Sequence, residues 1–182
     1  MITDTQPAAI SSRHVAVSKP VDIATDPVVI MFLDFDGVIS THRAYTANRG
    51  MTDRRRWIDE VATSMLMALH DRFPFKIVVS STWRSFGQST CSSALWLSGL
   101  SKHMHDDWCT NQSHDGQRPT EIDEWLSRNN VIDFVILDDD NFAWTGKQLS
   151  RLAKCDPFNG LTWEAFCRLE NLLKEIYSDV VA

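Results

Sequence analysis

Three apolar runs of similar length stand out along the chain, and a polar cluster follows each of them. They cover residues 28–33 (VVIMFL), 75–80 (FKIVVS) and 131–137 (VIDFVIL). Short continuous apolar runs are typical of strands that are buried on both faces, as in a parallel sheet. We therefore predict three buried strands whose carboxyl ends carry polar side chains.

Segments with helical periodicity lie between and after these strands. They cover residues 57–69, 85–97, 119–126 and 162–176. Pro119 suits the first turn of the third helix, and Thr162 suits the N-cap of the last helix, whose inward face would include Trp163. Weaker strand patterns cover residues 103–109 and, as an edge strand, residues 148–154.

Strands that alternate with helices predict an α/β fold of three layers with a mostly parallel sheet. In such sheets, ligands bind beyond the carboxyl ends of the strands. Because the polar clusters occupy that edge, we expect them to converge into one site.

The overall composition is that of one soluble globular domain of 182 residues. We expect residues 1–27 to be a loosely ordered lead-in without the apolar core of a signal peptide, and residues 28–182 to form the domain. No apolar run approaches a membrane span, and the four cysteines lack C-x-x-C spacing, so we expect a cytoplasmic protein with reduced thiols. The net charge of −6 argues against a protein that coats nucleic acid, although a local basic patch could still bind phosphate.

The clearest chemical signal is the pair Asp34 and Asp36 with Gly37, directly after the first apolar run. Side chains two positions apart in an extended segment point the same way, so both carboxylates are expected to face one pocket. Two such close acids need a cation or a shared proton. An anionic Asp34 that holds a metal and acts as nucleophile, beside an Asp36 that transfers protons, meets this need. Gly37 permits a sharp turn that brings backbone amides near a phosphate.

A second acidic cluster, Asp138-Asp139-Asp140, follows the third apolar run. Carboxylates from two strand ends make an oxygen-rich site, which suits Mg²⁺. A metal there would offset the repulsion between an anionic nucleophile and an anionic phosphate. We expect Asp34, Asp36, Asp138 and Asp139 to form the metal site, with Asp140 as a turn residue or an outer neighbour.

Two further motifs join the two acidic ones, and with all four the sequence resembles phosphohydrolases of the haloacid dehalogenase (HAD) superfamily. The four motifs are Asp34-Phe35-Asp36-Gly37-Val38, Ser80, Arg118-Pro119 and Asp138-Asp139. A finer resemblance, to small HAD domains of RNA-repair proteins, rests on LDFDGV at 33–38, SSTWR at 80–84, the helix at 118–126 and LDDD at 137–140. It implies a Rossmann-like fold, and the short intervals between the motifs leave no room for a large cap domain.

The resemblance also implies a role for each acidic motif residue. Asp34 would form an aspartyl-phosphate, and Asp36 would protonate the leaving oxygen and then activate water. Asp138 would hold Mg²⁺ with Asp139 beside it, and the backbone carbonyl of Asp36 would supply another ligand.

The remaining motif residues would bind the phosphate. Ser80, or alternatively Ser81, would donate a hydrogen bond to the phosphoryl oxygens. Arg118 would neutralise the nucleophile and the phosphate, with Lys102 or Lys147 as the alternatives for this role.

Residues next to these motifs are candidates for substrate binding. Trp83 and Arg84 follow the second motif, so we expect Trp83 at the pocket rim stacking a base, or else packed in the core, and Arg84 on a second phosphate. A short insertion at about residues 40–56 carries one acid, Asp53, and five arginines: Arg43, Arg49, Arg54, Arg55 and Arg56. Such a local field attracts polyanions, although solvated arginines at a helix start are the alternative.

These observations favour a Mg²⁺-dependent phosphomonoesterase whose partner is a phosphorylated substrate, RNA or DNA ends or nucleotides. The alternatives are a phosphatase of small metabolites or phosphoproteins, and a binding or regulatory module with little turnover. Intact Asp34 and Asp36 argue against the last of these. We expect no membrane association and no obligatory protein partner.

One further cluster superficially resembles a zinc site. It consists of His103, His105, Cys109 and His114, whose spacing matches no common zinc module. We interpret it as a polar loop with a packed cysteine.

Overall fold

The computed structural model describes residues 28–112 and 116–181. The sheet consists of β1 (Val28–Leu33), β2 (Lys76–Val79), β3 (Met104–Cys109), β4 (Val131–Asp138) and β5 (Leu152–Lys154). The α-helices are α1 (His42–Ala47), α2 (Glu60–His70), α3 (Gln88–Trp96), α4 (Arg118–Arg128), α5 (Gly146–Arg151) and α6 (Trp163–Val181). Three short 3₁₀ helices are η1 (Arg54–Trp57), η2 (Thr82–Phe86) and η3 (Leu100–His103). The predicted lead-in lies outside the described residues.

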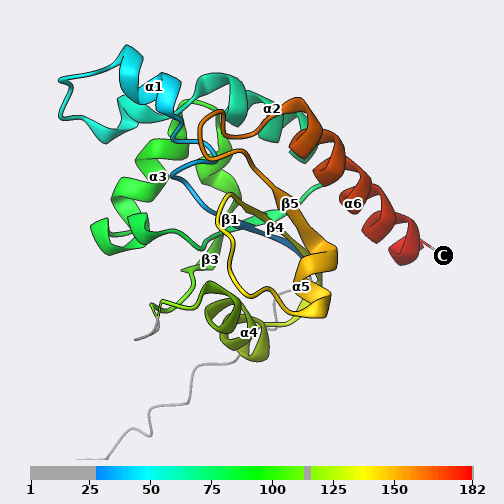
Figure 1. Ribbon diagram of the computed structural model, residues 1–182. Coiled ribbons are helices and arrows are strands. Elements are labelled where there is room, and N and C mark those ends of the chain that lie inside the picture. The colour runs from blue at the N-terminus through cyan, green and yellow to red at the C-terminus, as the bar shows by residue number, and fades with distance from the viewer. Residues whose placement is uncertain (1–27, 113–115, 182) are drawn as a thin grey trace, which may run out of the picture.

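All strand pairs are parallel, in the order β3-β2-β1-β4-β5. Along β1, Val29, Met31 and Leu33 face the core that α2 and α6 cover, and Ile30 and Phe32 face the core against α4. Figure 1 shows these helices on opposite faces of the sheet. The predicted three-layer α/β fold is confirmed, and no separate cap domain occurs among the described residues.

The direction of the strand order reverses at β1, because β2 and β3 continue on one side of it and β4 and β5 on the other. Ligands in parallel sheets bind at such a switch point, beyond the carboxyl ends of the strands. Hydrogen bonds continue past the strands there, since the Asp34 amide donates to the Leu137 carbonyl at 3.0 Å and the Ser80 amide to the Leu33 carbonyl at 3.0 Å. The ends of β1, β2 and β4 are thereby held side by side.

Two predicted helices differ in their bounds. The first begins only after Asp59, whose carboxylate accepts hydrogen bonds from the Val61 amide at 3.0 Å and the Ala62 amide at 3.3 Å. The second is divided at Gly87, which has a φ of +86° and separates η2 from α3.

Three other helices, α5, α6 and α1, also differ from what the sequence predicts. Half of the edge strand predicted at 148–154 is α5, because Thr145 and Gln148 form a capping box. The prediction that Trp163 faces inward is wrong: its side chain is 70% exposed and stacks on Phe166. Helix α1 is too short for its periodicity to be recognised in the sequence. Among the described residues, no helix has both the length and the apolar character that crossing a membrane requires.

Candidate functional site

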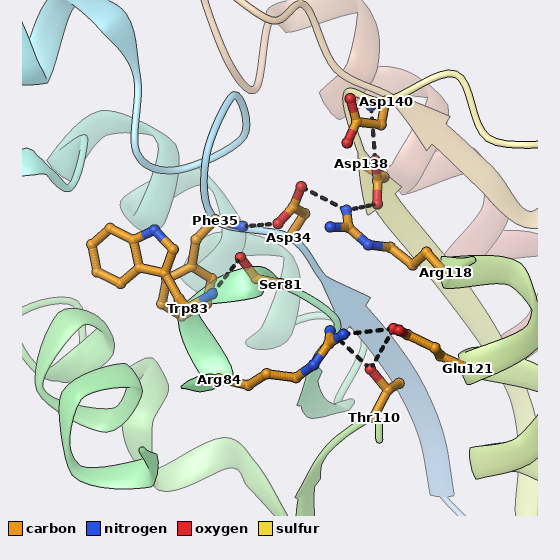
Figure 2. A network of polar contacts seen from close by, with 10 residues as sticks. All are labelled: Asp34, Phe35, Ser81, Trp83, Arg84, Thr110, Arg118, Glu121, Asp138 and Asp140. Carbon is orange, nitrogen blue, oxygen red and sulfur yellow. Dashed lines mark hydrogen bonds and ion pairs between the residues drawn. The ribbon is translucent and has the colours of Figure 1, made fainter. Parts of the chain in front are cut away.

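The carboxyl ends of β1 and β4 bring together Asp34, Asp138 and the first residue of α4, Arg118. One guanidinium nitrogen of Arg118 donates to Asp34 Oδ2 at 2.7 Å and also to Asp138. Figure 2 shows the guanidinium between the two carboxylates. All three side chains are buried. Of the three residues considered for the third motif, Arg118 is therefore the one that contacts Asp34: Lys147 pairs with Asp133 instead, and Lys102 lies on η3.

Burial and mutual repulsion shape the protonation of this group. Burial raises the pKa of Asp34, although Arg118 opposes the shift. Burial raises the pKa of Asp138 to about 7; Arg118 again opposes the shift, and the nearby charge of Asp34 adds to it. For Arg118, burial works against the charge, but the attraction of both carboxylates prevails and raises its pKa. One cation is thus shared by two buried acids, and a further cation at this site would be favourable.

An oxygen-rich group at this edge fits a divalent metal ion. Carboxylate oxygens of Asp34, Asp138 and Asp140 all lie within 4.8 Å of one another. Hard cations such as Mg²⁺ prefer oxygen donors of this kind. The side chains of Asp36 and Asp139, predicted as ligands, are not members of this group, whereas Asp140 is. Alternation alone does not identify the members, because Asp140 lies two positions after Asp138 and joins the group, whereas Asp36 lies two positions after Asp34 and does not.

Asp139 lies instead against Gly37. A Cβ atom at Gly37 would come within 2.2 Å of Asp139 Oδ2, and the φ of Gly37 is +69°. Burial and the nearby charges of Asp34 and Asp140 raise the pKa of Asp139 to about 6. Gly37 therefore serves a close approach between the loops after β1 and β4, as well as a turn.

Ser81 is the serine whose hydroxyl contacts Asp34 in the structure. Its side chain hydrogen-bonds the Asp34 carboxylate, which lowers the pKa of Asp34 against the effect of burial. Ser81 Oγ also accepts a hydrogen bond from the Trp83 amide at 3.3 Å. The hydroxyl of Ser80 is fully buried and has no hydrogen-bond partner among the described residues. Both serines remain candidates for the phosphate ligand.

Trp83 and Arg84 do not lie at the rim. The Trp83 side chain is 1% exposed and packs against Phe35 with ring centroids 5.2 Å apart, so the expectation that Trp83 packs in the core is confirmed and the one that it stacks a substrate base is wrong. Arg84 is also turned inward, where it pairs with Glu121 at 2.8 Å and donates to Thr110 at 3.2 Å. Figure 2 shows this second polar network beside the acidic group. The structure thus gives Arg84 a partner within the protein in place of a phosphate.

The guanidinium of Arg118 has a further neighbour that the sequence analysis missed. Its Cζ atom lies 5.0 Å from the centre of the Phe142 ring, a cation–π contact. Phe142 in turn meets Trp144 edge to face. No motif in the sequence marks this contact, because it depends on the path of the loop after Asp140.

The basic insertion forms α1 and η1, and its charge is smaller than the sequence predicted. Arg43 pairs with the buried carboxylate of Asp59 at 2.5 Å, and Arg55 pairs with Asp53 at 2.6 Å. The side chain of Arg54 lies outside what the structure describes. Beside the insertion is a cavity of about 1000 Å³ whose lining includes Arg43, Arg55, Arg56 and the exposed Trp96 of α3.

The zinc-like cluster does not assemble among the described residues. His103 stacks on His70, with ring centroids 3.6 Å apart, and His105 meets the edge of Trp125. Cys109 ends β3, and His114 lies outside the described residues.

Comparisons with known proteins give one match. A family model described as the HAD domain in Swiss Army Knife RNA repair proteins matches residues 30–166. The matched region contains all four motifs and the acidic group. No curated protein and no solved structure matches the chain.

Proposed function

The chain belongs to the family of HAD domains in Swiss Army Knife RNA repair proteins, and from this premise we propose that it is a Mg²⁺-dependent phosphomonoesterase acting on nucleic-acid ends or nucleotides. Membership indicates HAD-type phosphohydrolase chemistry with a divalent metal. The single observation that carries the proposal is the buried Asp34, held by Arg118 beside a second buried acid, Asp138.

In the proposed reaction, an oxygen of Asp34 attacks phosphorus and forms an aspartyl-phosphate as the P–O bond to the substrate breaks. Asp36 donates a proton to the departing oxygen. It then accepts a proton from the water that attacks the phosphorus; the bond between phosphorus and the Asp34 oxygen breaks, which restores the Asp34 carboxylate and releases inorganic phosphate. The side chain of Asp36 is exposed, which suits exchange of protons with substrate and water.

The other residues hold charge and orientation. Arg118 keeps Asp34 in place and offsets negative charge near it, and the hydroxyls of Ser80 and Ser81 would donate to phosphoryl oxygens. Asp34, Asp138 and Asp140 would hold the metal, with the Asp36 carbonyl as a further ligand. When bound, Mg²⁺ supplies positive charge that reduces the repulsion between nucleophile and phosphate.

Three observations support a nucleic-acid substrate over a small metabolite. The family to which the chain belongs consists of HAD domains in RNA repair proteins. No cap domain covers the acidic edge among the described residues, so a bulky substrate has access to it. The cavity beside α1 has the exposed Trp96 in its lining, a side chain of the kind that stacks on bases, while its arginines are balanced by the acids of the same lining.

The test is a phosphate-release screen with Mg²⁺ and with chelator, on 5′- and 3′-phosphorylated oligonucleotides, mononucleotides, sugar phosphates and phosphopeptides. We expect release from the oligonucleotides or nucleotides, loss of activity with chelator, and a loss of about a thousandfold or more in Asp34→Asn. Asp179→Asn, at an exposed position of α6, is the matched control and should retain full activity.

Each alternative has its own result in this screen. Preferred turnover of sugar phosphates or phosphopeptides would contradict the nucleic-acid substrate while leaving the mechanism. Binding of phosphorylated oligonucleotides without turnover of any substrate would favour a binding module. Wild-type turnover in a purified Asp34→Asn sample would overturn the aspartyl-phosphate.

A further inference from the structure

An exposed phenylalanine stands at the same edge of the sheet as the acidic group. The loop between β5 and α6 carries Phe158, whose side chain is 68% exposed. In Figure 1 this loop lies beside the segment that leads from β1 to α1. Covering a large apolar ring that is this exposed is favourable, because it removes apolar surface from water. The position of Phe158 relative to the acidic group therefore matters.

The loop holds the backbone at Phe158 in a defined conformation. Asp156 Oδ1 accepts hydrogen bonds from the Phe158 amide at 2.9 Å and from the Asn159 amide at 2.8 Å. The backbones of Asp156 and Gly160 exchange two hydrogen bonds, of 2.7 and 3.2 Å, which close the turn. A residue on such a turn loses little backbone freedom when a ligand covers its side chain.

Both ends of this loop are attached to the loops that carry the acids. The Cys155 amide donates to the Asp138 carbonyl at 2.9 Å, and the Leu161 amide donates to the Val38 carbonyl at 3.0 Å. Gly160 packs so closely that a Cβ there would lie 2.4 Å from the Val38 carbonyl oxygen. These contacts therefore fix the position of the Phe158 loop relative to the loops that carry Asp34, Asp36 and Asp138.

His42, the first residue of α1, supports the ring from one side. The two rings meet edge to face, with centroids 6.3 Å apart and an interplanar angle of 75°. Both residues are exposed. In an edge-to-face pair the neighbour covers one face of a ring at most, so at least one face of Phe158 stays available for a flat ligand.

We propose that Phe158, supported by His42, is the stacking platform for the base of the nucleotide whose phosphate binds at Asp34. This inference rests on the proposed function and narrows its substrate to unpaired, single-stranded nucleic-acid ends. Aromatic side chains stack on any base, because every base has a π-face. A paired terminal base is already stacked in its duplex, and freeing it is costly, so an unpaired end is the favoured occupant.

The experiment measures binding, so it does not depend on turnover. Asp34→Asn protein with Mg²⁺ is titrated into fluorescent single-stranded oligonucleotides with a 5′ or a 3′ phosphate, and anisotropy gives each Kd. Each oligonucleotide is made with a normal terminal nucleotide and with an abasic one. For one of the two ends, we expect the abasic form to bind about fivefold or more weakly, as for the loss of one stacked base.

Variants in the same background then locate the preference. Phe158→Ala should bring the ratio of abasic to normal Kd close to one, and Phe158→Tyr should keep it high. Ile132→Ala removes another exposed apolar side chain, at the start of β4 and so at the opposite edge of the sheet, and should leave the ratio unchanged. Circular dichroism checks that each variant is folded.

Different results would overturn the stacking platform and the proposed function. An unchanged ratio in folded Phe158→Ala overturns the platform, as does equal binding of normal and abasic ends or no binding of either. A wild-type protein that releases no phosphate from any substrate overturns the proposed function alone. A blunt phosphorylated duplex that binds more tightly than the single strand overturns the restriction to unpaired ends.

Discussion

The bridge that Arg118 makes between two buried carboxylates leads to a quantitative prediction about stability. Arg118→Met keeps the length of the side chain and removes its charge, which leaves Asp34 and Asp138 buried without their cation. Removing one partner of a buried ion pair costs about 3–5 kcal/mol. For a domain of this size, each kcal/mol lowers Tm by about 2–4 °C, so we expect a loss of about 6–20 °C.

The assay is thermal unfolding followed by circular dichroism at pH 7.5 in chelator. Arg72→Met is the matched control, because Arg72 is 52% exposed and pairs with Glu170 on the surface. A surface pair contributes about 1 kcal/mol or less, so the Tm of this variant should stay within about 4 °C of wild type.

Two results would refute the reasoning about Arg118. One is an Arg118→Met variant that melts no lower than the Arg72→Met control. The other concerns pH: burial already raises the pKa of Asp138 to about 7, and loss of Arg118 raises it further. As the pH falls, Asp34 and Asp138 of the variant take up protons, and a neutral buried acid is less costly than a charged one. The Tm deficit of Arg118→Met should therefore shrink between pH 7.5 and pH 5. A deficit that grows on acidification would contradict the assignment.

Two further predictions concern the loop after β1 and a pair of histidines. Gly37→Ala combines a positive φ with a clash against Asp139, so we expect a loss of at least about 1–2 kcal/mol in urea unfolding together with reduced phosphate release; unchanged stability would contradict the close approach. Burial lowers the pKa of both His70 and His103, so the unfolded chain takes up protons first, and stability should fall as pH decreases below about 6.5. His103→Gln should flatten this dependence in urea titrations between pH 5 and pH 8.

The arrangement of the fold could be predicted because the central strands have an unusually clear pattern. The runs that became β1, β2 and β4 are apolar on both faces, which is typical of strands in a parallel sheet covered by helices on both sides. The helix bounds were harder, because they depend on single side chains. Asp59 begins α2 by capping it, and Gly87 separates η2 from α3.

The basic insertion shows why a count of charges along a segment is an incomplete guide. Five arginines and one acid within residues 41–56 predict a strongly positive surface. The partner of Arg43, however, is Asp59, which lies beyond that window and is buried when the chain folds. Charge is neutralised by neighbours in space, and the distance along the chain does not define them.

The side chains of the residues after the second motif also point where the sequence alone does not indicate. A position next to a motif places a residue near the site, but the turn that follows decides where its side chain points. In η2 that turn sends Trp83 into the core and Arg84 toward Glu121 on α4. Because α4 begins with Arg118, the buried pair between Arg84 and Glu121 ties the segment that carries Ser81 to the helix that carries the site's cation. Arg84, expected on a substrate phosphate, is therefore better explained as a residue that positions Arg118 against Asp34.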